Sequence, residues 1–486
     1  MKLNELMHPW SDASFPAFEI LGLDNDSRRI KPGFLFFAYP GHQTDGRLFI
    51  TQALSAGASA IVYEPAQWPA DVPKPPRSIS FAVQRLAECL PAIASRFYLD
   101  PSQQLSVVGI TGTNGKTSVA YQLTQAEQLL NGKAAYIGTI GQGILPKLSA
   151  TANTTPDALC LQRWLAEYQT EGARHVFLEV SSHALCQGRV DGVAFTQAIF
   201  TNLSHEHLDY HQNMEAYAKA KSQLFTYTSL KSAILNQDDP YSQRMRKAVV
   251  APQCQILTYG LDTSADVSAS EVEVGMAGSQ FQLSSPWGNA LIRIRTVGLF
   301  NVYNALTVLA SLLARGYSLT IVSAMMKQLT APPGRMEVVS QEPCVIVDYA
   351  HTPDALEQAL RSLNRVKKGR LLVVFGCGGN RDTEKRPQMG EIASRYADQI
   401  ILTNDNPRRE NPREILNAIS KGIPSSFKCL DRIEDRKQAI TQSISLMSKQ
   451  DVLLIAGKGH EDYQEVGAER YAFSDQEVVR DILGKC

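Results

Sequence analysis

Short apolar runs recur along the chain, and the segments between them are polar or glycine-containing. In the middle of the chain the runs alternate with longer segments of helical character, and each run is followed by polar residues. These runs lie at residues 105–108, 175–180, 197–200 and 233–235. Strands that alternate with helices predict a mostly parallel sheet, and such a sheet binds ligands at the carboxyl ends of its strands.

A second series of apolar runs begins after Pro332-Pro333-Gly334, which is a natural joint between domains. These runs lie at residues 344–347, 371–375, 399–402 and 452–455. Helical segments separate them, and the pattern predicts a second doubly wound unit. The start of the chain holds only short strand-like runs, at 34–38 and 60–63, followed by a proline-rich loop.

We therefore predict an α/β protein of three domains. These are a small N-terminal α/β domain (1–99), a central parallel-sheet domain with a mononucleotide-binding P-loop (100–332) and a C-terminal Rossmann-like domain (333–486). The length of 486 residues agrees with this division, because a single hydrophobic core rarely supports so long a chain.

Composition excludes several classes of partner. The 48 Lys and Arg residues balance 48 Asp and Glu residues, so no net charge attracts nucleic acid or an anionic membrane. No apolar run approaches the roughly 20 residues of a membrane helix, and no signal peptide is visible. The eight cysteines lack C-x-x-C spacing. We expect a cytoplasmic protein without a nucleic-acid partner or membrane insertion.

The strongest local motif is a glycine-rich segment between a predicted strand and a predicted helix, residues 109–117. Its glycines let backbone N–H groups approach phosphate oxygens, Lys116 can neutralise the β- and γ-phosphates, and Thr117 can reach Mg²⁺. The match to a P-loop is imperfect, because its glycines stand at 109 and 112 and position 110 is Ile. The alternative is a glycine-rich turn that binds nothing. The strand–loop–helix context favours nucleotide binding by Gly112, Thr113, Asn114, Gly115, Lys116, Thr117 and Ser118.

Residues 111–117, Thr-Gly-Thr-Asn-Gly-Lys-Thr, resemble the nucleotide loop of the Mur ligases and of their relative folylpolyglutamate synthetase. Further motifs extend the resemblance to the Mur ligases over nearly the whole chain. It implies an ATP-dependent ligase that forms an amide through an acyl phosphate, with the N-terminal domain binding a UDP-sugar. The implied reaction adds meso-diaminopimelate to UDP-N-acetylmuramoyl-L-alanyl-D-glutamate during peptidoglycan precursor synthesis.

The resemblance also implies residue roles. In residues 26–28 and 41–46, which taken alone are ordinary turns, the contacts to the UDP-sugar are Ser27, His42, Gln43 and Thr44. In residues 153–156 and 179–189, the contacts to the muramoyl dipeptide are Asn153, Thr154, Thr155, Ser181, Gln187 and Arg189. In residues 298–304 and 333–353, the contacts to ATP are Asn301 near the adenine and Arg335 and Asp348 at phosphate and ribose.

Two Mg²⁺ ions are implied, held by Thr117, Glu179, His207 and a modified Lys221. Glu179 stands at the end of an apolar strand, and its alternative is a satisfied structural carboxylate. Residues 201–211 are rich in His, but they lack the H-E-x-x-H order of a zinc site and any Cys. The family usually has Asp before the histidine where this chain has Glu206 before His207.

Lys221 falls within an apolar stripe at helical spacing, with Tyr217 and Ala218 before it and Leu224 and Phe225 after it. A partly buried lysine tends to lose its proton. The alternative is a lysine whose ammonium reaches solvent. The family's lysine in Ala-Lys-x-x-Leu-Phe is carbamylated, so the resemblance implies N6-carboxylysine at position 221 and catalytic roles for Lys116, Glu179, His207 and Lys221.

Three C-terminal segments are implied to select the incoming amino acid, at residues 378–382, 405–408 and 457–461. Their implied contacts are Arg381, Asp405, Asn406, Pro407, Arg408, Gly457 and Glu461. For residues 405–408 the alternative is a simple helix start at Pro407. Arg408 favours diaminopimelate, because an arginine can pair bidentately with the distal carboxylate that lysine lacks.

Three rival functions remain open from sequence. The first is folylpolyglutamate synthetase, against which the segments near His42 and Arg408 argue. The second is the lysine-adding relative, which Arg408 disfavours. The third is a P-loop switch that binds a partner protein and makes no amide. No residue stands out as the general base for the incoming amine, and we expect a monomer.

Overall fold

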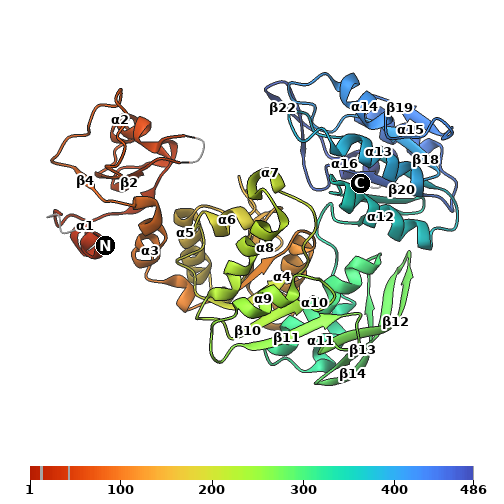
Figure 1. The fold of residues 1–486 in the computed structure, drawn as a ribbon, viewed down its shortest axis with the longest axis horizontal. Coiled ribbons are helices and arrows are strands. Elements are labelled where there is room, and N and C mark those ends of the chain that lie inside the picture. The colour runs from red at the N-terminus through yellow and green to blue at the C-terminus, as the bar shows by residue number, and fades with distance from the viewer. Residues whose placement is uncertain (11–14, 42–43, 485–486) are drawn as a thin grey trace.

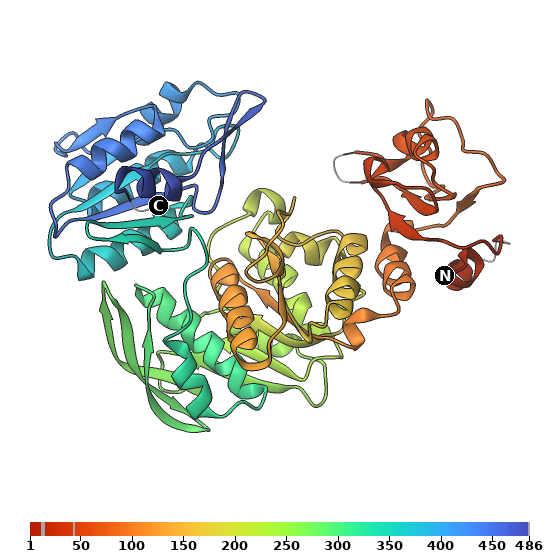
Figure 2. The same cartoon turned by 180° about the vertical axis from the view of Figure 1, so that it is seen from behind.

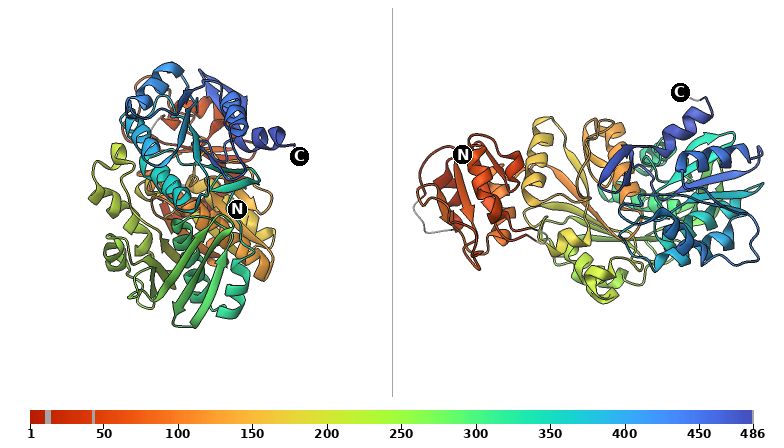
Figure 3. Two further views of the ribbon diagram at one scale, coloured as in Figure 1. Left: turned by 90° about the vertical axis from the view of Figure 1, so that its right-hand side faces the viewer. Right: turned by 90° about the horizontal axis from the view of Figure 1, so that it is seen from above.

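The structure is a computed structural model that describes residues 1–10, 15–41 and 44–484. Three large sheets follow one another along the chain and form three lobes, with the first and last lobes at opposite ends of the molecule (Figure 1, Figure 3). Parallel strands with flanking helices dominate the second and third sheets, which confirms the predicted α/β class. The boundaries near residues 99 and 332 stay predictions.

The N-terminal sheet is parallel, in the order β1-β2-β3-β4. Its strands are β1 Gly22–Asp24, β2 Phe34–Ala38, β3 Ala60–Tyr63 and β4 Ser80–Ala82, and its helices are α1 Leu3–Met7, α2 Ile50–Ser55 and α3 Leu86–Phe97. The bounds of β2 and β3 are those of the two predicted runs. The apolar core of this lobe also contains Leu159 from the central part of the chain, so the two parts share buried surface.

The central sheet has the strand order β14-β13-β12-β11-β10-β9-β5-β8-β6-β7. Its strands are β5 Ser106–Thr111, β6 Ala134–Gly138, β7 Gly141–Ile144, β8 His175–Glu179, β9 Phe195–Phe200, β10 Ser232–Asn236, β11 Gln255–Gly260, β12 Val267–Gly275, β13 Gly278–Ser285 and β14 Gly288–Ile294. Its helices are α4 Lys116–Asn131, α5 Ala158–Thr170, α6 Ser182–Cys186, α7 Leu208–His211, α8 Met214–Ser222, α9 Ser242–Ala248, α10 Leu299–Ala314 and α11 Leu319–Met326.

All four central runs predicted as strands are strands, and all are almost wholly buried. Parallel strands carry helices on both faces, so their sequences read as continuous apolar runs. Helix α10 packs against α4 and β11 (Figure 2). The sequence prediction missed β6, β7 and β11, and also β12, β13 and β14. β12 pairs in parallel with β11, and β13 and β14 extend the sheet in antiparallel fashion. β12 is buried only at its start and buried and exposed residues alternate in β13, so neither gives a continuous apolar run.

The C-terminal sheet has the order β15-β16-β20-β17-β18-β19, and only β15 is antiparallel. Its strands are β15 Glu337–Gln341, β16 Cys344–Asp348, β17 Leu371–Phe375, β18 Gln399–Leu402, β19 Leu430–Arg432 and β20 Val452–Ala456, with a separate hairpin of β21 Tyr463–Val466 and β22 Glu469–Ala472. Its helices are α12 Pro353–Val366, α13 Lys385–Tyr396, α14 Pro412–Ser420, α15 Arg436–Ser445 and α16 Asp475–Ile482.

The joint before the C-terminal sheet is tight. Gly334 has a φ of +65°, and a Cβ added there would lie 2.1 Å from the backbone nitrogen of His460. A side chain at this position therefore clashes with the backbone of the turn after β20. None of the helices in the described part of the chain combines the length and hydrophobicity needed to cross a bilayer.

Candidate active site

The glycine-rich loop joins β5 to α4, as predicted, and its backbone is held by the segment after β9. Gly112 has a φ of +150°, and a Cβ there would lie 1.9 Å from the hydroxyl oxygen of Thr201. The Asn114 backbone N–H donates to the side chain of Asn202 at 2.9 Å, and Thr201 donates to the Asn114 carbonyl at 2.6 Å. Helix α4 starts directly after Gly115, so its positive end faces the loop.

Lys116 turns back onto its own loop. Its Nζ donates to the carbonyls of Gly112 at 2.9 Å and Thr113 at 2.7 Å, and burial lowers its pKa. Phosphate oxygens are better partners for an ammonium than two carbonyls, because both groups are then charged. The loop thus has the form of an anion site with its cation in place.

A cavity of about 230 Å³ opens beside this loop. It brings together residues that are far apart in sequence, from the central sheet and from the start of the C-terminal part. The lining includes Thr113, Asn114, Gly115, Lys116, Thr117, Ser118, Thr139, Thr154, Glu179, Ser181, Glu206, His207, Tyr217, Lys221, Arg335, Tyr349 and His351. All four predicted catalytic residues line this one space.

Glu179 is fully buried at the end of β8 and is well held. It accepts hydrogen bonds from the Thr117 hydroxyl at 3.0 Å, from the Thr139 backbone at 3.0 Å and from the Tyr136 hydroxyl. Among the described residues no three His, Cys, Asp or Glu side chains group closely enough to hold a metal alone. Mg²⁺ needs fewer, because it takes one or two carboxylates with phosphate oxygens and water. Glu179 and Thr117 fit that donor set.

His207 and Glu206 form another wall of the cavity. The Nε2 of His207 lies 3.8 Å from Glu206, and the His207 ring meets the His183 ring edge-on at 5.0 Å between centroids. Burial lowers the pKa of His207, which keeps the imidazole neutral, as a metal ligand must be. The pKa of His183 falls to about 4, first through burial and then through the neighbouring His207.

Lys221 is buried, as its apolar stripe predicted, and only 1% of it is exposed. Its Nζ donates to the Gly112 carbonyl at 2.8 Å and lies 4.5 Å from the centroid of the Tyr217 ring. Burial lowers its pKa well below the usual value, and the nearby Lys116 lowers it further. The alternative of a lysine reaching solvent is therefore wrong. A neutral amine facing the cavity is the form that reacts with CO₂.

A second cavity, of about 450 Å³, adjoins the first and shares Asn114, Gly115, Ser118 and Arg335 with it. Asn301 and Asp348 also line it, which brings the three predicted ATP contacts together. The Asn301 amide donates to the Val297 carbonyl at 2.8 Å and accepts from Asn304 at 3.0 Å, so its hydrogen bonds are already partly used.

Arg335 and Asp348 come from the C-terminal part. The Arg335 guanidinium lies 4.5 Å from the Tyr349 ring centroid and donates to the Thr117 hydroxyl at 3.4 Å. Asp348 accepts from the Met336 and Ala350 backbones, and burial raises its pKa. The arginine therefore reaches across to the phosphate loop.

Sequence reasoning gave no role to several lining residues. Glu206 was noted only as a departure from the family pattern, and Tyr349 and His351 only as members of a motif. The structure puts all three around the cavity, and the His351 ring contacts the Tyr349 carbonyl at 2.9 Å through Nδ1. Tyr349 directly follows β16, which was an available signal because parallel strands end at one edge of a sheet. Glu206 and His351 stand further along their loops and carried no such signal.

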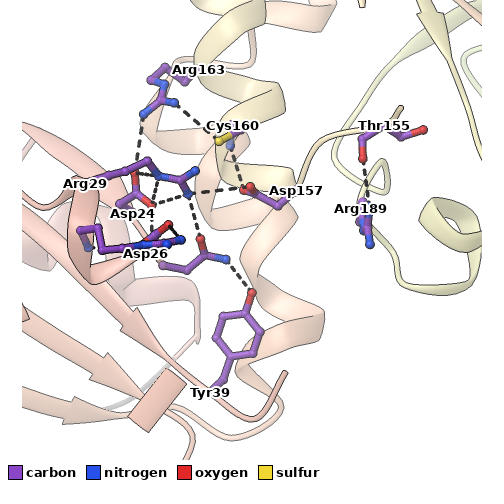
Figure 4. Close-up of polar contacts among 11 residues, drawn as sticks. Asp24, Asp26, Arg29, Tyr39, Thr155, Asp157, Cys160, Arg163 and Arg189 are labelled. Atoms are coloured by element: carbon purple, nitrogen blue, oxygen red, sulfur yellow. Dashed lines mark hydrogen bonds and ion pairs between the residues drawn. The ribbon is translucent and has the colours of Figure 1, made fainter. Parts of the chain in front are cut away.

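At the N-terminal end of the site an ion network joins the first two lobes (Figure 4). Asp24, 1% exposed, binds Arg29 through both its oxygens, with the shortest distance 2.7 Å. Arg163 of α5 lies 3.7 Å from the same carboxylate, and Arg29 lies 3.9 Å from Asp157, the N-cap of α5. Ser27 is adjacent in sequence and donates to the side chain of Gln52.

The predicted nucleotide-sugar contacts are only partly described. His42 and Gln43 lie outside the described residues, and Thr44 is exposed and accepts a hydrogen bond from the Gly41 backbone. Of the dipeptide contacts, Thr154 lines the first cavity and Asn153 is exposed beside it in sequence.

The other dipeptide contacts cluster after β8. Thr155 donates to the Glu179 carbonyl at 2.7 Å, and its own carbonyl accepts from Arg189 at 3.0 Å. Arg189 also contacts Gln187, and Ser181 caps α6. The structure thus brings Thr155, Ser181, Gln187 and Arg189 into one neighbourhood.

The three C-terminal segments meet at the carboxyl ends of β17, β18 and β20. A Cβ on Gly379 would lie 1.9 Å from the Pro407 carbonyl, and one on Gly457 would lie 2.5 Å from the Asp405 carboxylate. Arg381 is exposed, and its Cγ lies 3.8 Å from the Cβ position of Gly378. The predicted neighbourhood of these loops is therefore present.

Arg408 does not lie in a helix, and the alternative of a helix start at Pro407 is wrong. Helix α14 begins only at Pro412, while Arg408 has a φ of +51° and pairs with the hairpin strand β21. Its Nε donates to Glu465 at 3.1 Å and one terminal nitrogen donates to the Gly379 carbonyl at 2.9 Å. A long-range contact has overridden the local helix signal.

Three family models match the chain. These are the Mur ligase family catalytic domain over residues 19–98, the Mur ligase middle domain over 110–312 and the Mur ligase glutamate ligase domain over 334–459.

Curated relatives match at full length. The chain is 43% identical to a UDP-N-acetylmuramoyl-L-alanyl-D-glutamate–2,6-diaminopimelate ligase of Chromobacterium violaceum, over 95% of this chain and 94% of that protein. It is 44% identical to the Pseudomonas aeruginosa protein of the same name, over 99% and 98%. A solved structure of a ligase with this name has 37% identity and a TM-score of 0.73, over 100% of this chain and 99% of that one. With its sequence motifs, fold and site in agreement, the chain belongs to the Mur ligase family.

Proposed function

We propose that this protein is an ATP-dependent ligase that adds meso-2,6-diaminopimelate to UDP-N-acetylmuramoyl-L-alanyl-D-glutamate. One observation carries the proposal: the cavity beside Lys116 is lined by the four predicted catalytic residues and by residues of the C-terminal part. Chemistry at that place can draw ATP from one domain and an amino acid from the other. The names of the similar ligases supply the substrates.

The chemistry has two steps. The D-Glu carboxylate attacks the γ-phosphorus of ATP, ADP leaves, and an acyl phosphate forms. The amine of diaminopimelate then attacks the acyl carbon, the C–O bond to phosphate breaks, and the amine loses a proton. Most of the catalysis is positioning and charge neutralisation, for which Lys116 and Arg335 both line the cavity with Thr117.

Two Mg²⁺ ions belong to the proposal. Thr117 and Glu179 would hold one, and His207 with a carbamylated Lys221 would hold the other. When bound, Mg²⁺ neutralises charge on the transferring phosphoryl group. Burial of Lys221 beside Lys116 supports the carbamate, because it lowers the pKa of the lysine and so favours the neutral amine that reacts with CO₂.

The amino-acid end supports diaminopimelate over lysine. Arg408 is oriented by Glu465 and the Gly379 carbonyl. Both Arg408 and Arg381 lie beside Gly378. A lysine substrate would place an ammonium near these guanidiniums and leave them without a carboxylate. We also propose a monomeric, cytoplasmic enzyme, and light scattering after gel filtration tests the first of these.

The test is phosphate release with ATP, Mg²⁺, the UDP-dipeptide and a panel of meso-diaminopimelate, L-lysine and L-glutamate. We expect release only with dipeptide and diaminopimelate together. Comparable kcat/KM for lysine would reject the substrate assignment. Release that needs no amino acid would reject amide formation and favour a nucleotide switch. A folate substrate with L-glutamate tests the folylpolyglutamate rival in the same assay.

A further inference from the structure

Lys458 is a fully buried lysine to which sequence reasoning gave no role. It follows strand β20 and lies between two of the predicted amino-acid contacts. Its Nζ donates to the Oδ1 of Asn406 at 3.2 Å and to the Oε2 of Glu461 at 2.9 Å. The same ammonium lies 5.4 Å from the centroid of the Tyr463 ring. Burying a charged group is costly, so the burial of Lys458 between these partners calls for a functional or structural explanation.

The contacts fix both partners in one orientation. The Asn406 amide nitrogen donates to the Oε2 of Glu461 at 2.8 Å, and the amide oxygen accepts from Lys458 and from the Glu465 backbone at 3.0 Å. A flip of the amide would lose all three hydrogen bonds. Oε2 of Glu461 is thereby occupied twice, whereas no described residue donates to Oε1, and 17% of the side chain is exposed.

The charge of Lys458 also changes what Glu461 presents to a ligand. A carboxylate in a closed pocket with no cation beside it favours protonation and attracts any cation. Held by Lys458 and Asn406 through Oε2, the Glu461 carboxylate offers its other oxygen in a set direction. A free acceptor of this kind suits a substrate ammonium, while Arg408 on the same set of loops suits a carboxylate.

We propose that Lys458 is a positioning residue for the amino-acid substrate, which acts by holding Asn406 and Glu461 so that the free oxygen of Glu461 receives the substrate ammonium. This rests on the function proposed above. Lys458 itself does not touch the reacting atoms. Its loss should therefore weaken amino-acid binding and leave the ATP and dipeptide ends intact.

The experiment compares steady-state kinetics of the full-length parent enzyme with those of Lys458→Met and Lys458→Gln. We expect the KM for meso-diaminopimelate to rise about tenfold or more in Lys458→Met, since hydrogen bonds to charged groups are the strong ones. kcat and the KM values for ATP and UDP-dipeptide should change by less than about threefold. Lys458→Gln, which can donate to one partner, should lie between parent and Lys458→Met. The matched control is Lys437→Met, which removes an exposed lysine of α15 and should match the parent.

The combined variant Lys458→Met, Glu461→Gln tests whether the lysine acts through Glu461. If it does, the increases in KM of the single variants will not multiply, because the sites are coupled. Multiplying effects, an unchanged diaminopimelate KM in Lys458→Met, or a fall in kcat alone would overturn the proposal. Failure of both Lys458 variants to fold would also overturn it and assign the residue to domain stability. A parent enzyme that releases no phosphate with diaminopimelate would refute the proposed function instead.

Discussion

The central domain meets its two neighbours through junctions of different chemistry. At the N-terminal junction, Asp24, Arg29, Asp157 and Arg163 form ion pairs, and Leu159 enters the core of the first lobe. At the C-terminal junction, two cavities separate the domains. The polar contacts across it come from the phosphate loop and from Ser204.

The C-terminal junction also buries apolar surface, because Val297 of the central part lies in the core of the C-terminal lobe and Phe300 packs against it. Its polar contacts lie beside the cavities. Asp354 accepts from the Asn114 side chain at 2.9 Å and from Ser204 at 3.2 Å, and Arg335 reaches Thr117. A nucleotide would compete for or join these same groups. Since both junctions bury apolar side chains, the difference between them lies in the cavities. We expect the second junction to respond to what the cavities hold, and the first to be unaffected.

The largest expected effect is at the C-terminal junction. Lys116→Ala removes the buried cation of the phosphate loop, and turnover should fall by roughly 10³-fold, the scale of a key electrostatic group. Phosphate-release kinetics measure this, with the exposed Lys133→Ala as control. Near-normal turnover in folded Lys116→Ala protein would show that the chemistry does not occur between these domains.

The next effect concerns Lys221 on the same wall. Lys221→Ala should lower turnover by about 10²-fold or more, and acetate or formate should restore part of it by filling the vacated space with a carboxylate. Lys219→Ala, an exposed neighbour on α8, is the control. Mass spectrometry of active enzyme under carbamate-preserving conditions that finds only a free amine would reject the modification.

Arg408→Ala should weaken diaminopimelate by roughly tenfold to a hundredfold, as expected for a charge-assisted pair worth about 1.5–3 kcal/mol. The KM values for ATP and UDP-dipeptide should stay unchanged. Arg409→Ala, whose side chain is exposed, is the control in the same kinetic assay. An unaltered diaminopimelate KM would mean that Arg408 serves only to anchor the hairpin through Glu465.

The N-terminal junction predicts an effect on stability. Asp24→Asn removes the charge of a buried carboxylate, and the free energy of unfolding should fall by about 1–3 kcal/mol. Asp26→Asn is the control, because its partner Arg28 is 79% exposed and such pairs contribute at most about 1 kcal/mol. Urea unfolding compares the two. Equal losses would contradict the view that the ion network makes this junction permanent.

The smallest effect should follow Asp354→Ala at the C-terminal junction. This change removes the carboxylate that accepts hydrogen bonds from the neutral side chains of Asn114 and Ser204. We expect the KM for ATP to rise about two- to fivefold, in line with hydrogen bonds worth roughly 0.5–1.5 kcal/mol. Small-angle scattering should show compaction of the parent with ATP and dipeptide and less compaction of the variant. An identical profile of the parent in all ligand states would contradict a coupled junction.

Most strands buried on both faces could be predicted from the sequence, although β6, which is wholly buried, was missed. Residues 371–375 are wholly apolar and form β17 with the same bounds, and the stripe around Lys221 correctly placed that lysine inside. Where a strand is half-exposed, as in β13, the apolar run is interrupted and the strand was missed. The local sequence around Arg408 is misleading for a related reason. Its backbone conformation is set by pairing with a hairpin about 60 residues later in sequence.

In the site, too, features set by local sequence could be predicted, and features set by distant segments could not. The phosphate loop is local, so its chemistry could be derived from nine consecutive residues. Glu206, His351 and Lys458 act through neighbours from other segments, and no spacing in the sequence marks them. Ser27 and Thr44 could be assigned only by resemblance, because a turn that binds a nucleotide sugar has no composition of its own.

The contact of Gly334 with the turn at His460 bears on how the last domain can travel. Both residues belong to the C-terminal part, so this close approach ties the start of the domain to the turn after its own strand β20. We therefore expect the hinge to lie before Gly334 and Arg335 to travel with the C-terminal sheet. The guanidinium then reaches the Thr117 hydroxyl only when the two domains are together.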